Sequence, residues 1–395
     1  MLNPLSPGLR QGPLLGAALV ALVGAARAQP RTEEPLFKPA PGSPIAVAGY
    51  PGNIALGDVN QDGKPDLVVA SGPGFTVLLG QGDGGFSLAP GSPVQVPARP
   101  NEMVLRDLNG DGRMDLALAD HNSYAVTLLW GDGHGGFAPA DEPPVIMKAG
   151  ERPHTHGLDA GDLNGDGHLD LVTVNSEDSD VSVAFGDGRG GFTPAASSFA
   201  VGAQPYPATL ADLNGDGHLD IIATSTSRRT PEAEASTRAL TLLLGDGQGR
   251  FRNGRIPLRT VLPWFVAVAD MNGDGSPDLA ATHAERNELT ILLGDGRGGF
   301  TETPASPIDL GRSAWRMAVT DVNGDGKADV VAAAGDGLIV LLGGGQGDFQ
   351  PAPGSPFACG KGTWQLAVGD LNADGRADVA VTNLEADTVT VLLAR

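Results

Sequence analysis

Apolar residues in this chain come in short runs, and each run is bounded by glycine, asparagine, aspartate or proline. The same order recurs along the chain. A run such as FVAVAD precedes an acidic loop, runs such as LVVAS and LTILLG follow it, and then come a glycine-rich turn such as DGRGGF and a weaker run such as SPIDL. No unit has space for a helix of about ten residues or more. Short β-rich runs between turn-forming residues predict four antiparallel strands per unit.

The acidic loop sets the period of this pattern. The string DLNGDGHLD occurs twice, at 162–170 and 212–220, and five close relatives of it are present. The seven loops begin 49 to 58 residues apart, at Asp58, Asp107, Asp162, Asp212, Asp270, Asp321 and Asp370. Four strands in each of seven repeats predict an all-β, seven-bladed β-propeller. An open solenoid is the alternative, although its units are usually shorter.

The two ends of the chain favour a closed ring. The last repeat stops at TVTVLLAR, after its third strand, and lacks the glycine-rich turn and the fourth strand. A matching segment, FKPAPGSPIAV at 37–47, stands near the other end and resembles the fourth-strand segment FQPAPGSPFAC. Pairing of the N-terminal strand with the last blade would cover an exposed sheet edge. We therefore expect an N-terminal strand that closes the final blade.

The first 28 residues have the pattern of a cleavable export signal. Arg10 supplies a positive start, Leu14 to Ala25 form an apolar run too short to cross a bilayer, and ARA ends at Ala28. We predict cleavage after Ala28, a short linker over 29–36 and a propeller over 37–395. The mature chain is then secreted or periplasmic, without membrane insertion.

Composition narrows the choice of partner. The chain is 41% hydrophobic, enough for a large core, and its formal net charge is −21. A surface this acidic argues against nucleic acid or anionic lipid as the main partner. Cys359 is the single cysteine, so the chain has no internal disulfide and needs another means of stabilisation outside the cell.

The acidic loops have the donor set of a calcium site. Each loop places aspartate at positions 1, 5 and 9, asparagine at 3 and glycine at 6. Oxygen ligands at this spacing suit Ca²⁺, with the carbonyl of position 7 as a further ligand. A polar turn without metal is the alternative. The expected ligands, for up to seven ions, are Asp58, Asn60, Asp62, Asp66, Asp107, Asn109, Asp111, Asp115, Asp162, Asn164, Asp166, Asp170, Asp212, Asn214, Asp216, Asp220, Asp270, Asn272, Asp274, Asp278, Asp321, Asn323, Asp325, Asp329, Asp370, Asn372, Asp374 and Asp378.

These loops and the Gly-Phe turns resemble the FG-GAP (VCBS-type) repeat family, which includes the seven-bladed propeller of integrin α-subunits. The resemblance covers about residues 37 to 395. Integrin propellers carry the acidic cage on some blades, whereas every blade has it here. The resemblance implies calcium in the hairpin between the first two strands of a blade, on the face opposite the usual ligand face.

A row of aromatic residues marks a candidate ligand site. Six residues before the first aspartate of five loops stand His156, Tyr206, Trp264, Trp315 and Trp364. These positions begin the innermost strand, at the rim opposite the acidic hairpins. Aromatic rings at this rim can stack on sugar rings or anchor a peptide, or they can simply pack between neighbouring blades. A long polar loop at Ser225 to Arg238 reaches the same rim and is either a tolerated insertion or a recognition element.

The sequence favours a binding or adhesion module over an enzyme. His121, His154 and His156 fall in neighbouring rim loops, but no nucleophile motif accompanies them. We expect a monomeric, calcium-binding, non-catalytic module for a carbohydrate or protein ligand. A propeller enzyme of the polysaccharide lyase type and a purely structural protein are the alternatives, because fold alone does not choose among them.

Overall fold

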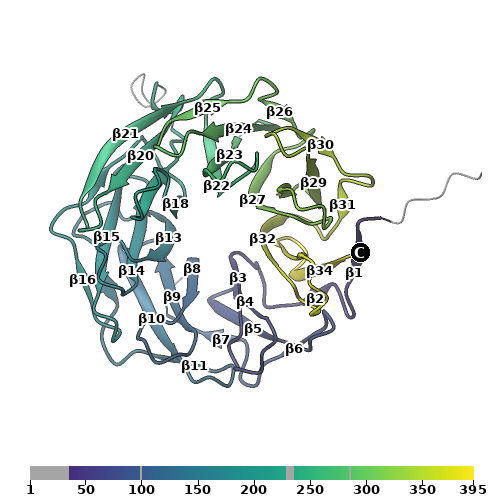
Figure 1. Cartoon of the computed structure of the whole chain (residues 1–395). Coiled ribbons are helices and arrows are strands. Elements are labelled where there is room, and N and C mark those ends of the chain that lie inside the picture. Colours follow the sequence, from purple (N-terminus) through teal and green to yellow (C-terminus); the bar gives the residue numbers. More distant parts are fainter. Residues whose placement is uncertain (1–34, 98–99, 228–234, 284–285) are drawn as a thin grey trace, which may run out of the picture. The chain divides into compact units, whose positions relative to one another are not determined.

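The structure is a computed structural model, and it describes residues 35–97, 100–227, 235–283 and 286–395. Its 34 strands form seven antiparallel sheets arranged around a ring (Figure 1). In six sheets the first strand faces the centre of the ring and the later strands follow outward in chain order. In the seventh, the first strand of the last repeat faces the centre, and the two N-terminal strands lie outermost, beside the C-terminal strand. The prediction of a seven-bladed β-propeller is confirmed, and the solenoid alternative is excluded. We number the blades 1 to 7 in chain order.

Each blade contains one repeat. Blade 1 consists of β3 (Ile54–Gly57), β4 (Asp66–Ser71), β5 (Gly74–Gly80), β6 (Phe86–Leu88) and β7 (Val94–Gln95). Blade 2 consists of β8 (Pro100–Arg106), β9 (Asp115–Asp120), β10 (Ala125–Gly131), β11 (Phe137–Pro139) and β12 (Val145–Ile146). Blade 3 consists of β13 (Thr155–Gly161), β14 (Asp170–Asn175), β15 (Asp180–Gly186), β16 (Phe192–Pro194) and β17 (Phe199–Ala200). Blade 4 consists of β18 (Ala208–Ala211), β19 (Asp220–Ala223), β20 (Ala239–Gly245) and β21 (Phe251–Pro257).

The remaining blades repeat this arrangement. Blade 5 consists of β22 (Pro263–Ala269), β23 (Asp278–His283), β24 (Glu288–Gly294), β25 (Phe300–Glu302) and β26 (Ile308–Asp309). Blade 6 consists of β27 (Ala314–Thr320), β28 (Asp329–Ala334), β29 (Gly337–Gly343), β30 (Phe349–Pro351) and β31 (Phe357–Ala358). Blade 7 consists of β32 (Thr363–Gly369), β33 (Asp378–Asn383) and β34 (Thr388–Ala394), together with β1 (Phe37–Pro39) and β2 (Ile45–Ala46).

The fourth strand differs from the sequence prediction. In six blades it is split into two short pieces that both pair with the third strand, as β6 and β7 pair with β5. Segments such as APGSP separate the pieces, because proline removes a backbone donor and interrupts the ladder. Only in blade 4, among the described strands, is the fourth strand continuous, as the seven-residue β21.

The N-terminal segment closes the ring as predicted. Strand β1 pairs antiparallel with β34, and Phe37 lies opposite Ala394. Strand β2 pairs with the beginning of β34, and the amide of Arg395 donates to the carbonyl of Leu36 at 3.0 Å. The last blade is therefore built from both ends of the propeller.

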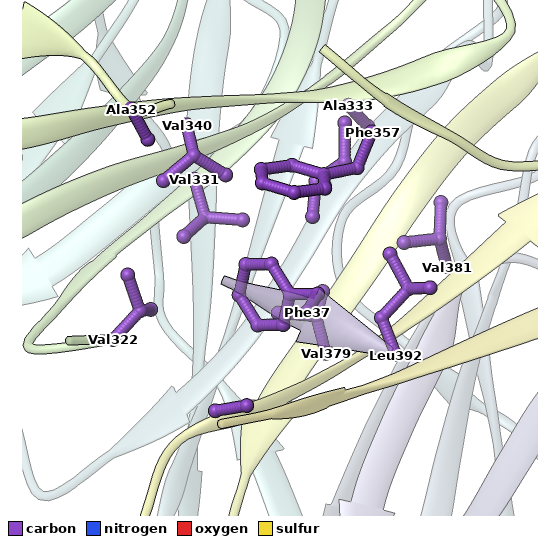
Figure 2. Close-up of a cluster of buried hydrophobic side chains, with 12 residues drawn as sticks. Phe37, Val322, Val331, Ala333, Val340, Ala352, Phe357, Val379, Val381 and Leu392 are labelled. Atoms are coloured by element: carbon purple, nitrogen blue, oxygen red, sulfur yellow. The ribbon is translucent and has the colours of Figure 1, made fainter. Parts of the chain in front are cut away.

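Phe37 anchors this closure in the core between blades 6 and 7. It lies beside Val379 and Leu392 of blade 7, and its ring meets Phe357 of blade 6 edge to face at 5.2 Å (Figure 2). Burial of such a side chain is worth about 2 kcal/mol or more. Strand β1 thus holds the sheets of two blades together.

The core lies mainly between neighbouring blades. The second strands are almost entirely buried, at every position in strands such as β4 and β14, which explains why their sequences are mainly apolar runs and do not alternate. Each of the seven large hydrophobic clusters combines residues of adjacent blades, as Phe75 of blade 1 packs with Leu116 and Leu129 of blade 2. Each blade therefore depends on its neighbours, and the closed ring leaves no exposed blade face.

Candidate functional site

The seven acidic loops all connect the first strand of a blade to the second, at the same end of the ring. In blade 3, for example, the loop follows Gly161 at the end of β13 and leads into Asp170 at the start of β14. Positions 4 to 6 of this loop are exposed, whereas position 9 is fully buried. The structure therefore places the predicted hairpins between the first two strands, as expected. It also separates the exposed aspartate of position 5 and the mostly half-buried aspartate of position 1 from the buried aspartate of position 9.

The side chains of positions 1, 3 and 5 are gathered by backbone N–H groups of their own loop. In all seven hairpins the amide of position 5 donates to the asparagine oxygen of position 3, at 2.8–3.1 Å. The amide of the glycine at position 6 donates to the aspartate of position 1, at 2.8–2.9 Å. That glycine has a φ of 79–85°, a conformation that L side chains rarely adopt. Three oxygen-bearing side chains consequently surround one turn.

The aspartate of position 9 has a role that the sequence did not indicate. In every hairpin one of its oxygens accepts the amide of position 2, and the other accepts the amide of the last residue of the third strand. In blade 3, Asp170 accepts from Leu163 and Gly186, both at 2.9 Å. A Cβ atom on Gly186 would lie 2.1 Å from the carbonyl oxygen of Leu169, so glycine permits this close approach. Position 9 thus ties the hairpin to the outer part of its blade.

Burial changes the protonation of these carboxylates. The pKa of Asp115, Asp170 and Asp378 is raised to about 6, and burial is the largest cause. Repulsion from the aspartates of positions 5 and 1 raises the pKa further, whereas the two backbone hydrogen bonds lower it. The pKa of position 9 is raised for the same reasons in the other four blades. Without a bound cation, burial therefore disfavours the charged form of these carboxylates at neutral pH.

This strain predicts a pH dependence of the metal-free protein. Because the pKa of about 6 in the folded state lies above the ordinary value of 3.8, the folded state holds more protons than the unfolded state between these two pH values. The stabilisation from protonated position 9 is present at low pH and is lost as the pH rises through 6. We expect the free energy of unfolding of metal-stripped protein, measured by urea titration, to be higher at pH 5 than at pH 7. An equal or lower value at pH 5 would contradict this assignment.

The donor chemistry of the hairpins fits a hard cation. The side chains of positions 1, 3, 5 and 9 offer only oxygen atoms, as Ca²⁺ requires, and each position 9 oxygen that accepts one N–H keeps a second lone pair. Both oxygens of the position 9 carboxylate nevertheless accept backbone N–H groups of the blade, so this side chain is held apart from the turn that positions 1, 3 and 5 surround. Positions 1, 3 and 5 face one another, while position 9 is directed into the blade.

The predicted aromatic residues lie at the opposite end of the first strands. They are joined in one series of ring contacts across blades 3 to 7. His156 stacks on Tyr206 with ring centroids 4.1 Å apart, and Tyr206 contacts Trp264 at 4.0 Å. Trp264 and Trp315 are 5.0 Å apart, and Trp315 and Trp364 are 5.5 Å apart. We call these five residues the aromatic arc. Each contact crosses a blade seam and all rings except His156 are partly exposed, so the arc combines packing with an accessible surface.

β-bulges direct these rings toward the rim. The pairing of the first and second strands shifts register between Thr155 and Gly157, between Pro263 and Phe265, between Ala314 and Arg316, and between Thr363 and Leu366. Each interval contains an arc residue. A bulge adds one residue to a strand and re-aims its side chain, which frees the arc residue from the regular alternation.

One orphaned polar atom lies within the arc. The indole Nε1 of Trp264 is buried and has no hydrogen-bond partner in the described structure. Tyrosine and tryptophan usually satisfy their polar atom when it is buried. The N–H of Trp264 is therefore an unsatisfied donor within the described part of the chain.

Polar residues of different blades contact one another near the aromatic arc. Arg316 of blade 6 forms an ion pair with Glu102 of blade 2, and Asn53 also donates to Glu102. The guanidinium of Arg316 lies over the ring of Phe265, 5.0 Å from its centroid. A cavity of about 320 Å³ lies here, lined by first-strand residues of six blades. Glu102 and Arg316 are 214 residues apart in sequence, and no local pattern identified them.

The protonation of two arc residues is set by burial. Burial, followed by the nearby His154 and His121, lowers the pKa of His156 to about 3, so this ring is neutral. Burial, followed by the charge of Glu102, raises the pKa of Tyr206 to about 12, so its phenol remains a hydrogen-bond donor. The arc therefore presents neutral rings at neutral pH.

Other sequence predictions fall partly outside the described residues. The expected signal peptide at 1–28 and linker residues 29–34 lie outside them, as do residues 228–234 of the long loop. The two described parts of this loop contact each other, since the hydroxyl oxygens of Ser225 and Ser236 share a hydrogen bond of 2.6 Å, and the hydroxyl of Ser225 donates to the carbonyl of Ala203 at 3.0 Å. The described residues include no helix long and apolar enough to cross a membrane.

Comparison with known families identifies the repeat. The model of the FG-GAP-like repeat matches residues 58–118, 107–173, 162–223, 270–332 and 321–381. Each match runs from the acidic hairpin of one blade to the second strand of the next. The unmatched stretch between the third and fourth matches contains the long loop of blade 4. No curated protein matches the chain.

Solved structures share the fold at low sequence identity. One is an Agrocybe aegerita lectin, studied for specific recognition of non-reducing terminal N-acetylglucosamine, with 21% identity, a TM-score of 0.55, and coverage of 87% of this chain and 86% of the lectin. A second is BBS1N in complex with ARL6DN, with 12% identity, a TM-score of 0.60, and coverage of 92% and 98%. A third is a catalytically inactive virginiamycin B lyase from Staphylococcus aureus with quinupristin, with 12% identity, a TM-score of 0.53, and coverage of 91% and 98%. These likenesses concern the fold.

Proposed function

The chain belongs to the FG-GAP-like repeat family, and we propose that it is an exported, calcium-loaded propeller that binds a carbohydrate or protein ligand at its aromatic arc. The acidic hairpins carry the metal ions at one end of the ring. The arc forms the recognition surface at the other end. In this proposal the metals stabilise the scaffold and take no part in ligand contact.

The repetition of one donor set supports the calcium component. All seven hairpins keep the same oxygen-bearing residues and the same backbone hydrogen bonds, although their other residues vary. The side chains of positions 1, 3 and 5, with the carbonyl of position 7, would hold the ion, and position 9 would complete the shell. A bound cation would offset the repulsion between carboxylates and replace the disulfides that the chain lacks.

The continuous arc is the observation that carries the binding component. Five rings at equivalent positions of consecutive blades form one partly exposed surface. Aromatic faces stack on the apolar faces of sugar rings, and an indole N–H donates to a hydroxyl or carbonyl oxygen. The likeness to a lectin makes carbohydrate the first class to test, and the likeness to BBS1N makes a protein surface the second.

Removal of two central rings is expected to abolish ligand binding. The double substitution Trp264→Ala and Trp315→Ala deletes the middle of the arc, and each truncated anchor residue commonly costs about 2 kcal/mol of binding free energy. We expect the affinity for the best ligand from a glycan array to fall at least about 30-fold, measured by titration calorimetry.

Trp130→Ala provides the matched control for this experiment. Trp130 lies on β10, packs beside Val126 and Leu128, and is not part of the arc. The control variant should keep the affinity of the wild type once a thermal melt confirms that it is folded. Equal affinities of the wild type and the double variant would refute the arc as the binding surface. If no glycan binds, a protein ligand recovered by pull-down replaces the glycan in the same comparison.

A further inference from the structure

Three histidines meet at the rim between blades 2 and 3, at the opposite end of the ring from the acidic hairpins. His121 follows β9, and His154 and His156 lie at the start of β13. Their ring centroids are 4.3, 4.4 and 4.8 Å apart. Each offers a ring nitrogen, and these three nitrogens lie within 4.8 Å of one another. Residues from two blades thus converge on one point.

Backbone hydrogen bonds hold the two segments together. The amide of Thr155 donates to the carbonyl of His121 at 3.2 Å, and its hydroxyl donates to the carbonyl of Ser123 at 2.9 Å. The amide of Ser176 donates to the carbonyl of His154 at 2.9 Å. These hydrogen bonds hold the main chain of blade 2 beside that of blade 3, so the Cα atoms of the three histidines are kept near one another.

A neighbouring amide sets the tautomer of His121. Its Nδ1 lies 3.1 Å from Oδ1 of Asn122. An amide oxygen only accepts hydrogen bonds, so Nδ1 carries the proton and Nε2 carries the lone pair. Metal-binding histidines usually donate their second ring nitrogen to an oxygen in this way, which fixes the ring and its tautomer.

We propose that His121, His154 and His156 bind one divalent transition-metal cation of the zinc class. Three imidazoles without a carboxylate in the group suit Zn²⁺, Cu²⁺ or Ni²⁺ and do not suit Ca²⁺, which takes oxygen ligands. Zinc–nitrogen bonds of about 2.0–2.1 Å place the nitrogens of a tetrahedral site about 3.3 Å apart. His121 and His154 are partly exposed, and rotation of their side chains draws the nitrogens to this separation.

The proposed site leaves one coordination position open. Three protein ligands and a fourth position for water or a substrate atom are characteristic of zinc sites that act on a ligand. His156 also stacks on Tyr206, so the metal would stand at the end of the aromatic arc. The inference goes beyond the proposed function, because metal binding at this site requires no ligand on the arc and no ion in the hairpins.

Zinc titration of untagged protein tests the site. The protein is first loaded with millimolar calcium, so that the acidic hairpins are filled, and Zn²⁺ is then titrated by calorimetry and by equilibrium dialysis. We expect one equivalent of zinc to bind the wild type. The double substitution His121→Ala and His154→Ala should weaken this binding at least 100-fold, because a single remaining imidazole holds zinc poorly.

The matched control is the double substitution His168→Ala and His218→Ala, which removes two exposed histidines of the acidic hairpins. This control should bind zinc as the wild type does. Absence of zinc uptake by the wild type, full uptake by the His121/His154 variant, or loss of uptake in the control would each overturn the proposal. If the alanine variant does not fold, His154→Gln is titrated in its place. The visible spectrum of the Co²⁺-loaded wild type then reports whether three nitrogens bind in a tetrahedral site.

Discussion

Removal of calcium is expected to lower the melting temperature of the purified protein by on the order of 20 °C. A site that is occupied at 100 times its dissociation constant stabilises the folded state by about 2.7 kcal/mol. For a domain of this size, an unfolding entropy of about 2.1 cal/mol/K per residue converts this to about 3–4 °C for each site. The effect is large because seven hairpins with the same donor set are expected to act together. Differential scanning calorimetry in chelator and in millimolar calcium measures the difference.

Two controls separate calcium from other effects of the chelator. Restoring calcium alone must restore the melting temperature, which distinguishes the hairpins from the three histidines. Sodium chloride at matched ionic strength must not restore it, since general screening would also reduce repulsion between the carboxylates. Equal melting temperatures with and without calcium would show that the hairpins are polar turns.

The architecture could be predicted because the same information occurs seven times in the sequence. A single DLNGDGHLD string predicts only a turn, but seven copies at a regular interval specify the blade and its number. The match between 37–47 and the fourth-strand segments predicted the closure that Phe37 now shows, opposite Ala394. Local sequence was sufficient to predict the blades and the closure of the ring, because each strand pairs with a neighbour in the chain or, for β1 and β2, with the C-terminal strand β34.

Features that depend on contacts between blades could not be predicted in this way. The ion pair of Glu102 with Arg316 joins residues that only the closed ring brings together. The sequence placed His121, His154 and His156 in neighbouring rim loops, but their ring contacts follow from the packing of a loop of blade 2 beside the first strand of blade 3. The β-bulges also escaped prediction, since an added residue is visible only against the register of the partner strand.

The two groups of aspartates also could not be separated in the sequence. Positions 1, 5 and 9 are the same residue and appear as equivalent ligands. In the structure Asp166 is exposed at the hairpin, whereas Asp170 is fully buried and accepts two backbone N–H groups. The partner of Asp170 at the end of the third strand, Gly186, is 16 residues away and carries no charge or motif that would reveal the contact.

Replacement of a buried position 9 aspartate is expected to destabilise the protein whether or not calcium is present. In Asp170→Asn one carboxylate oxygen becomes an NH₂ group, which faces the backbone N–H of either Leu163 or Gly186. Two donors then oppose each other at a fully buried position, and a charge-assisted hydrogen bond is lost. The expected loss is about 2–4 kcal/mol in the free energy of unfolding, measured by urea titration in calcium and again in chelator.

Asp166→Asn, at position 5 of the same hairpin, is the matched control. Its side chain is exposed and lies within the turn, so it contributes as a metal ligand and as a source of repulsion. In calcium this variant should be less stable than the wild type, because a charged ligand is lost. In chelator it should be at least as stable as the wild type, because a neutral side chain relieves the repulsion between the carboxylates of the hairpin. If the loss in Asp170→Asn also disappears in chelator, position 9 acts only through the metal. A loss that persists in chelator shows that the buried carboxylate holds the hairpin to its blade before any ion binds.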